Sequence, residues 1–84
     1  MKMASKFDGK TGTVVFVKAL CAVRDLALNY CDMSSEDSVL LDIESVTSVF
    51  NPETAVQWES VDQKLYDLLT EASEEGAHYL MLTP

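Results

Sequence analysis

The side chains of this chain that could do chemistry are two cysteines, one histidine and many carboxylates. Cys21, Cys31 and His78 form neither a CxxC nor an HxxxH pair, and these are the spacings typical of zinc ligands. An EF-hand loop that began at Asp32 would need glycine at its sixth position and glutamate at its twelfth, but the sequence has other residues there. We therefore expect no metal and no cofactor.

Catalysis by a nucleophile also finds no support in the sequence. His78 has no serine or cysteine motif beside it, and "GKTGT" at 9–13 lacks the spacing of a phosphate-binding loop. Carboxylates are abundant, but on exposed helical faces they stay solvated, and their pKa values cannot shift far enough for acid–base catalysis. We expect a protein that is not an enzyme.

The cysteines and the hydropathy pattern bear on where the protein works. If Cys21 and Cys31 share one helix, they are about 15 Å apart, which is too far for a disulfide, so both are expected to be small buried hydrophobes. The sequence shows no apolar run long enough to span a bilayer and no apolar block of a signal peptide near Met1. We expect a soluble cytoplasmic protein.

The distribution of charge is the strongest clue to function. Residues 1–24 carry a net charge of +4, residues 25–84 carry −12, and the whole chain of 84 residues carries −8. Such a field repels nucleic acids and anionic membranes and attracts basic partners. Even "TEASEEG" at 70–76, which reads as the end of a helix, is acidic. Carboxylates there are repelled by the negative end of the helix dipole, which lowers the stability of the helix by about 0.3–1 kcal/mol each.

A helix over 53–75 would position these carboxylates. Asn51 and Pro52 are typical of a helix start, and Gly76 is typical of a helix end in a left-handed turn. An apolar stripe from Trp58 to Ala72 would face the core, with the acidic residues on the opposite side. We predict a partner-binding face of Glu59, Asp62, Tyr66, Asp67, Glu71, Glu74 and Glu75.

The rest of the chain favours further helices. Apolar residues recur at helical spacing over 13–32 and over 36–50, which predicts an all-α, compact three-helix bundle of 13–32, 36–50 and 53–75 with an apolar C-terminal tail. The alternative is a small α+β fold with short strands near 13–17, 38–43 and 78–82. Residues 1–84 form one small acidic domain in either case, and 1–12 could be a flexible basic segment.

Three explanations compete for the glutamates of "TEASEEG". They could only confer solubility, they could dock Lys2, Lys6 and Lys10 of the same chain or of a second copy, or they could bind a basic partner. We favour the third: a regulator, an inhibitor (antitoxin-like) or an adaptor whose carboxylate-rich helix occupies a basic protein surface, in one version as a nucleic-acid mimic. The alternative is a structural homo-oligomeric helical module, a homodimer for example, assembled through the apolar first helix.

Overall fold

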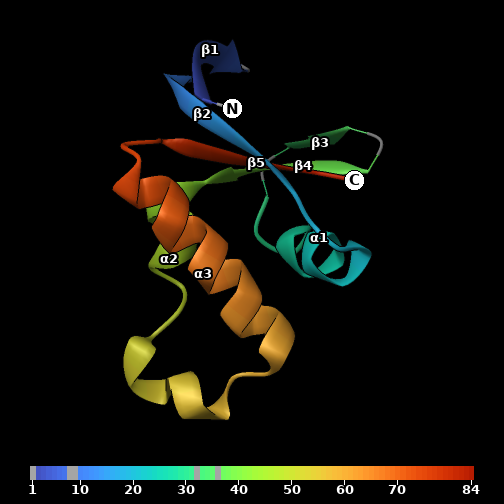
Figure 1. The fold of residues 1–84 in the computed structure, drawn as a ribbon, viewed down its shortest axis with the longest axis vertical. Coiled ribbons are helices and arrows are strands. Elements are labelled where there is room, and N and C mark those ends of the chain that lie inside the picture. The colour runs from blue at the N-terminus through green and yellow to red at the C-terminus, as the bar shows by residue number, and fades with distance from the viewer. Residues whose placement is uncertain (1, 8–9, 32, 36) are drawn as a thin grey trace.

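The protein folds as a small α+β domain, with the helices on one side of a mixed sheet (Figure 1). A computed structural model describes the backbone of residues 2–7, 10–31, 33–35 and 37–84, and the side chains of 13–31, 34 and 37–84. The elements in chain order are β1 (Lys2–Phe7), β2 (Lys10–Lys18), α1 (Cys21–Ala27), β3 (Met33–Ser35), β4 (Ser38–Asp42), α2 (Ile43–Thr47), the 3-10 helix η1 (Pro52–Gln57), α3 (Ser60–Glu74) and β5 (Tyr79–Thr83).

The sheet has the strand order β1-β2-β5-β4-β3. Strand β5 lies at its centre, parallel to β2 with Val15 opposite Leu80, and antiparallel to β4 with Leu41 opposite the same leucine. The last strand of the chain is therefore inserted between two earlier ones. The antiparallel strands β1 and β3 form the two edges.

The prediction of a three-helix bundle is wrong, and the α+β alternative describes the chain better. The segment 13–32 is not one helix, because residues up to Lys18 belong to β2 and only Cys21–Ala27 are α-helical. Val14 and Val15 are consecutive and both almost fully buried. A central strand buries consecutive residues on its two opposite faces. The apolar run at 13–17 is therefore a buried strand and not part of a helix.

The change from strand to helix at residues 19–20 uses no turn residue. The extended backbone of Leu20 caps α1 without a side-chain hydrogen bond. Arg24 of α1 holds the junction instead, since its Nε donates to the carbonyl of Ala19 at 3.1 Å and its Nη1 donates to that of Asp37 at 3.1 Å. A strand can therefore lead directly into a helix without a turn residue between them.

The predicted helix over 36–50 is also wrong in its first half. Val39, Leu40 and Leu41 are consecutive and buried, as in β4, and helix α2 begins only at Ile43. The Asp42 side chain ends the strand and caps the helix by accepting a hydrogen bond from the Ser45 amide at 3.2 Å. Apolar residues over 36–50 do recur at helical spacing, but the segment consists of strand β4 followed by the short helix α2.

The predicted helix over 53–75 is confirmed from residue 60 onward. Asn51 caps η1, with Pro52 in its first turn, but the backbone is extended at Trp58 and Glu59 before α3 begins. At the other end, Gly76 has φ +82°. The amides of Gly76 and Ala77 donate to the carbonyls of Ser73 and Ala72 at 2.9 and 3.1 Å, which is the Schellman pattern of a helix end.

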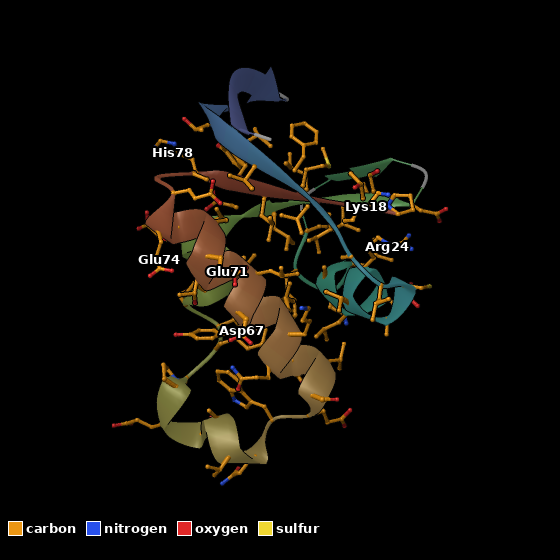
Figure 2. The ribbon with its side chains drawn as sticks, in the orientation of Figure 1. Lys18, Arg24, Asp67, Glu71, Glu74 and His78 are labelled. Carbon is orange, nitrogen blue, oxygen red and sulfur yellow. The ribbon has the colours of Figure 1, made fainter. Side chains whose placement is uncertain are left out.

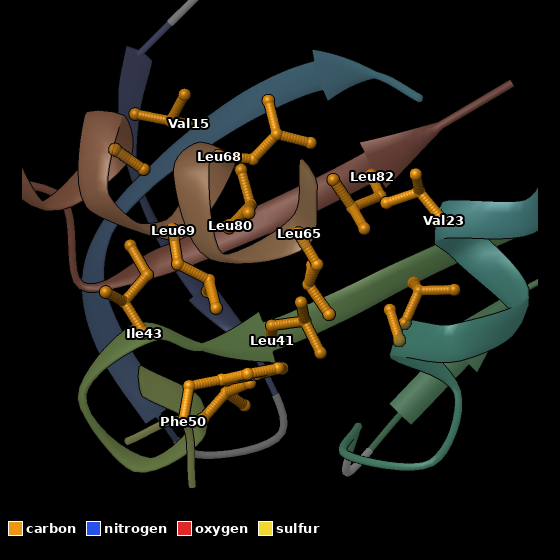
Figure 3. Packing of buried hydrophobic residues seen from close by; sticks show 14 residues of the cluster. Val15, Val23, Leu41, Ile43, Phe50, Leu65, Leu68, Leu69, Leu80 and Leu82 are labelled. Carbon is orange, nitrogen blue, oxygen red and sulfur yellow. The ribbon is translucent and has the colours of Figure 1, made fainter. Parts of the chain in front are cut away.

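The main core fills the space between the sheet and the helices (Figure 3). Leu65 and Leu69 of α3 are fully buried, as are Leu41, Leu80 and Leu82 from the sheet. A smaller cluster on the other face of the sheet contains Val14, Leu40 and Tyr79, with Phe16 and Met81 partly buried against it. Because α3 lies against the sheet, its opposite side is left for solvent.

Candidate functional site: the acidic side of helix α3

The solvent side of α3 brings together three of the predicted carboxylates. Asp67, Glu71 and Glu74 are exposed and lie at i, i+4 and i+7 (Figure 2). At 1.5 Å per residue they follow one another by about 6 and 4.5 Å along the helix axis. We call these three residues the acidic face.

The acidic face has little internal neutralisation. Asp67 Oδ1 accepts a hydrogen bond from Gln63 Nε2 at 3.0 Å, and among the residues that the structure describes neither Glu71 nor Glu74 forms an ion pair. Both glutamates belong to the last two turns of α3, where no basic residue offsets the dipole. The unfavourable charge that the sequence indicated is therefore present in the fold.

Glu59 and Asp62 are separated from this face and have a structural function. Glu59 is the N-cap of α3, and the Asp62 carboxylate accepts a hydrogen bond from the Glu59 amide at 3.2 Å, in the arrangement of a capping box. Carboxylates are favourable at a helix N-terminus. The capping of the α3 N-terminus therefore explains why these two residues are acidic.

Tyr66 lies in an aromatic cluster at the edge of the core. Its ring centroid is 5.1 Å from that of Trp58 and 6.1 Å from that of Phe50, and Tyr30 packs on Phe50 at 5.7 Å. The tyrosine is half-buried against the main core. Packing against the core is enough to explain a tyrosine at this position, so no partner is needed to account for it. The residue is partly exposed.

Glu75 follows α3 as its C-cap and is exposed, next to Gly76. The lysines considered as its intramolecular partners, Lys2, Lys6 and Lys10, lie on β1 and at the start of β2. Whether those lysines dock on the acidic helix stays a prediction.

A groove that the sequence did not predict lies beside the end of α3. Its volume is about 460 Å³, and it is lined by Ile43, Glu44, Thr47, Ser48, Ser73, Ala77 and His78. The contributing segments, α2 and the connection from α3 to β5, are far apart in the sequence. Only knowledge that β5 starts next to the β4–α2 junction could have revealed the groove.

His78 is exposed and anchors one wall of this groove. Its amide donates to the Thr13 carbonyl at 2.8 Å, and its Nδ1 accepts from the Thr13 amide at 3.2 Å. Its carbonyl accepts from the Ile43 amide at 3.0 Å. The histidine therefore ties β2, β5 and α2 together, which is a structural function.

A second pocket, of about 430 Å³, lies where β2 ends, at the opposite end of the sheet from His78 (Figure 2). Its lining combines Lys18 and Lys64 with Ala19, Leu20, Val23 and Pro84. The two lysines place positive charge around this pocket, and Lys64 lies on α3 one turn before Asp67.

The cysteines differ from the sequence-based expectation. Cys21, at the start of α1, is exposed, and Cys31 is only partly buried. Both are free thiols. Across the described residues, no group of three or more histidine, cysteine or acidic side chains is placed to hold a metal ion. None of the helices found in that part of the chain has the length and apolar character needed to cross a bilayer.

Comparisons with protein-family models, with curated proteins and with solved structures gave no match for this chain.

Proposed function

We propose that this protein is a small non-enzymatic binding factor that presents the acidic face of α3 to a basic surface of another protein. The observation that carries the proposal is the placement of Glu71 and Glu74 near the negative end of a helix dipole, where the described side chains supply no compensating cation. Local rules of helix stability are most often broken where function requires it. An inhibitor, an antitoxin-like regulator or an adaptor would act in this way.

A nucleic-acid mimic is one version of this function. Carboxylates about 4.5–6 Å apart along a helix form a row of negative charges that a groove for phosphates could accept. A mimic of this kind competes with DNA or RNA for its partner and does not bind nucleic acid itself. The proposed location is the cytoplasm, which the two free thiols support, because cysteines stay reduced there.

The structure removes the basis of the self-assembly alternative. That hypothesis required an apolar helix over 13–32, but this segment divides into β2 and the short helix α1. The segment therefore offers no long apolar helix through which copies of the chain could assemble.

The test compares two variants with equal charge. The face variant carries Asp67→Asn, Glu71→Gln and Glu74→Gln, and the control variant carries Asp25→Asn, Asp37→Asn and Glu53→Gln, exposed residues outside α3. Each variant loses three carboxylates, so the net charge of −8 becomes −5 in both. We expect immobilised wild-type and control protein to retain a common partner from a lysate of the source cell, and the face variant to lose it. Equal retention by the face variant would refute the proposal.

A further inference from the structure

The groove beside α3 has a fixed shape because backbone hydrogen bonds hold its walls. One wall is α2, and the other is the end of α3 with Ala77 and His78. The Ile43 amide joins them by its bond to the His78 carbonyl at 3.0 Å, and the two bonds between His78 and Thr13 fix the second wall to the sheet. A pre-formed site of this size could bind a side chain without much reorganisation.

The carboxylate and the hydroxyl groups of the side chains that line this groove can each accept a hydrogen bond. Ser48 Oγ donates its proton to the Ser45 carbonyl at 2.6 Å, so its lone pairs remain available to a ligand. Among the described residues, the buried Thr47 Oγ1 finds no hydrogen-bond partner. Glu44 adds an exposed carboxylate, and Ser73 a further hydroxyl.

The charge around the groove favours a cation. Among the described residues that line it, none is a lysine or an arginine. His78 accepts a hydrogen bond at Nδ1, so its own proton is on Nε2 and the ring is uncharged in this arrangement. The negative end of the α3 dipole and the exposed Glu74, next to the lining residue Ser73, add to the negative potential.

We propose that this groove receives an arginine side chain of the basic polypeptide that docks on α3, an inference that rests on the proposed function. Arginine has five donors in a planar group and no acceptor, so several acceptors at different positions suit it better than they suit a lysine ammonium. Ile43 and Ala77 provide apolar lining for its methylene groups. The acidic face would supply general attraction, and the groove would select arginine.

The experiment measures binding of two fluorescent peptides by anisotropy, one alternating arginine with glycine and the other alternating lysine with glycine. Wild-type protein should bind the arginine peptide more tightly. Thr47→Val removes an acceptor at nearly constant shape and charge, and should weaken that binding by about tenfold. Glu44→Gln should weaken it by roughly two- to fivefold, the range for an exposed ion pair. Glu53→Gln, an exposed carboxylate on η1, is the matched charge control and should have a much smaller effect.

Thr47→Val also separates binding from folding. Because Thr47 Oγ1 has no partner in the described structure, replacing the hydroxyl by a methyl group should leave the midpoint of thermal unfolding unchanged or raise it. Weaker binding by a variant of undiminished stability would therefore come from the groove itself. The lysine peptide should respond less to this substitution.

The outcomes distinguish the two proposals. Equal affinity for both peptides, or unchanged arginine binding in both Thr47→Val and Glu44→Gln, would overturn the groove assignment. If the face variant still weakens both peptides in that case, the acidic surface remains supported. Absence of binding to either peptide would overturn the groove and the proposed function together.

Discussion

The glutamates at the end of α3 illustrate a conflict between stability and charge at the scale of single residues. Glu74 is the last residue of the helix and Glu71 lies one turn before it, where the backbone carbonyls already carry partial negative charge. Asp62, at the opposite end, has the same charge in a favourable position and makes a capping hydrogen bond. The same side-chain chemistry therefore stabilises one end of α3 and destabilises the other.

This conflict predicts that Glu74→Gln stabilises the fold. We expect the free energy of unfolding to rise by about 0.3–1 kcal/mol, because a repulsion with the helix dipole is removed. Urea denaturation followed by circular dichroism measures it. Asp62→Ala is the comparison at the other end, and the loss of its cap should lower stability by about 0.5–2 kcal/mol. A destabilised Glu74→Gln protein would show that this carboxylate has a structural partner.

Gly76 tests the end of the same helix. Its φ of +82° is strained for any residue with a Cβ, although no atom would clash with an added methyl group. Gly76→Ala should therefore lower the free energy of unfolding by about 1–2 kcal/mol through backbone strain alone. Gly76→Asn should cost less, because asparagine tolerates this conformation. Equal stability of the glycine and alanine proteins would contradict the left-handed helix end.

At the scale of elements, α3 was predictable from its sequence and the sheet was not. The stripe of Leu65, Leu68 and Leu69 and the stop at Gly76 agree with each other, whereas Asn51 and Pro52 mark the start of η1. In 13–17 and 38–42, by contrast, the apolar residues are consecutive, so they do not map to one side of a helix or of a strand. That pattern is shared by a buried strand and a buried helix. Only the pairing of both segments with β5, more than 35 residues away in the chain, decides between them.

The same reasoning explains which parts of the candidate site were predictable. The carboxylates of one helix face follow from its period of 3.6 residues, so Asp67, Glu71 and Glu74 were found together. The groove depends on α2 meeting the segment before β5, which requires the sheet order.

The packing of α3 on the sheet predicts a large effect of truncating its core residues. Leu65→Ala removes a fully buried side chain that lies between the helix and the sheet (Figure 3). It should lower the free energy of unfolding by about 2–5 kcal/mol. Leu20→Ala, at a position that is 74% exposed, should change it by less than about 0.5 kcal/mol. Similar small effects for both would contradict the placement of α3 over the sheet.

At the scale of the whole molecule, the net charge of −8 sets the sign of the electrostatic field. Lys18 and Lys64 line the pocket with Leu20 and Val23, whereas Glu44 and the end of α3 border the acidic groove. A field of this sign attracts a basic partner. Binding through exposed carboxylates should therefore weaken steeply as salt is raised.

The salt dependence gives a prediction for any partner recovered with the wild-type protein. Since the Debye length falls from about 10 Å at 0.1 M salt to about 3 Å at 1 M, retention should decrease continuously over that range. A partner held equally well at both concentrations would indicate an apolar interface elsewhere on the molecule.

The most direct test measures stability and partner retention together on the face variant, Asp67→Asn with Glu71→Gln and Glu74→Gln. Binding through the acidic face predicts that this protein unfolds at the same or a higher urea concentration than the wild type and yet loses the basic partner, which the control variant of equal charge retains. A face variant that folds as well as the wild type and still retains the partner would contradict the assignment of the acidic face as a binding surface.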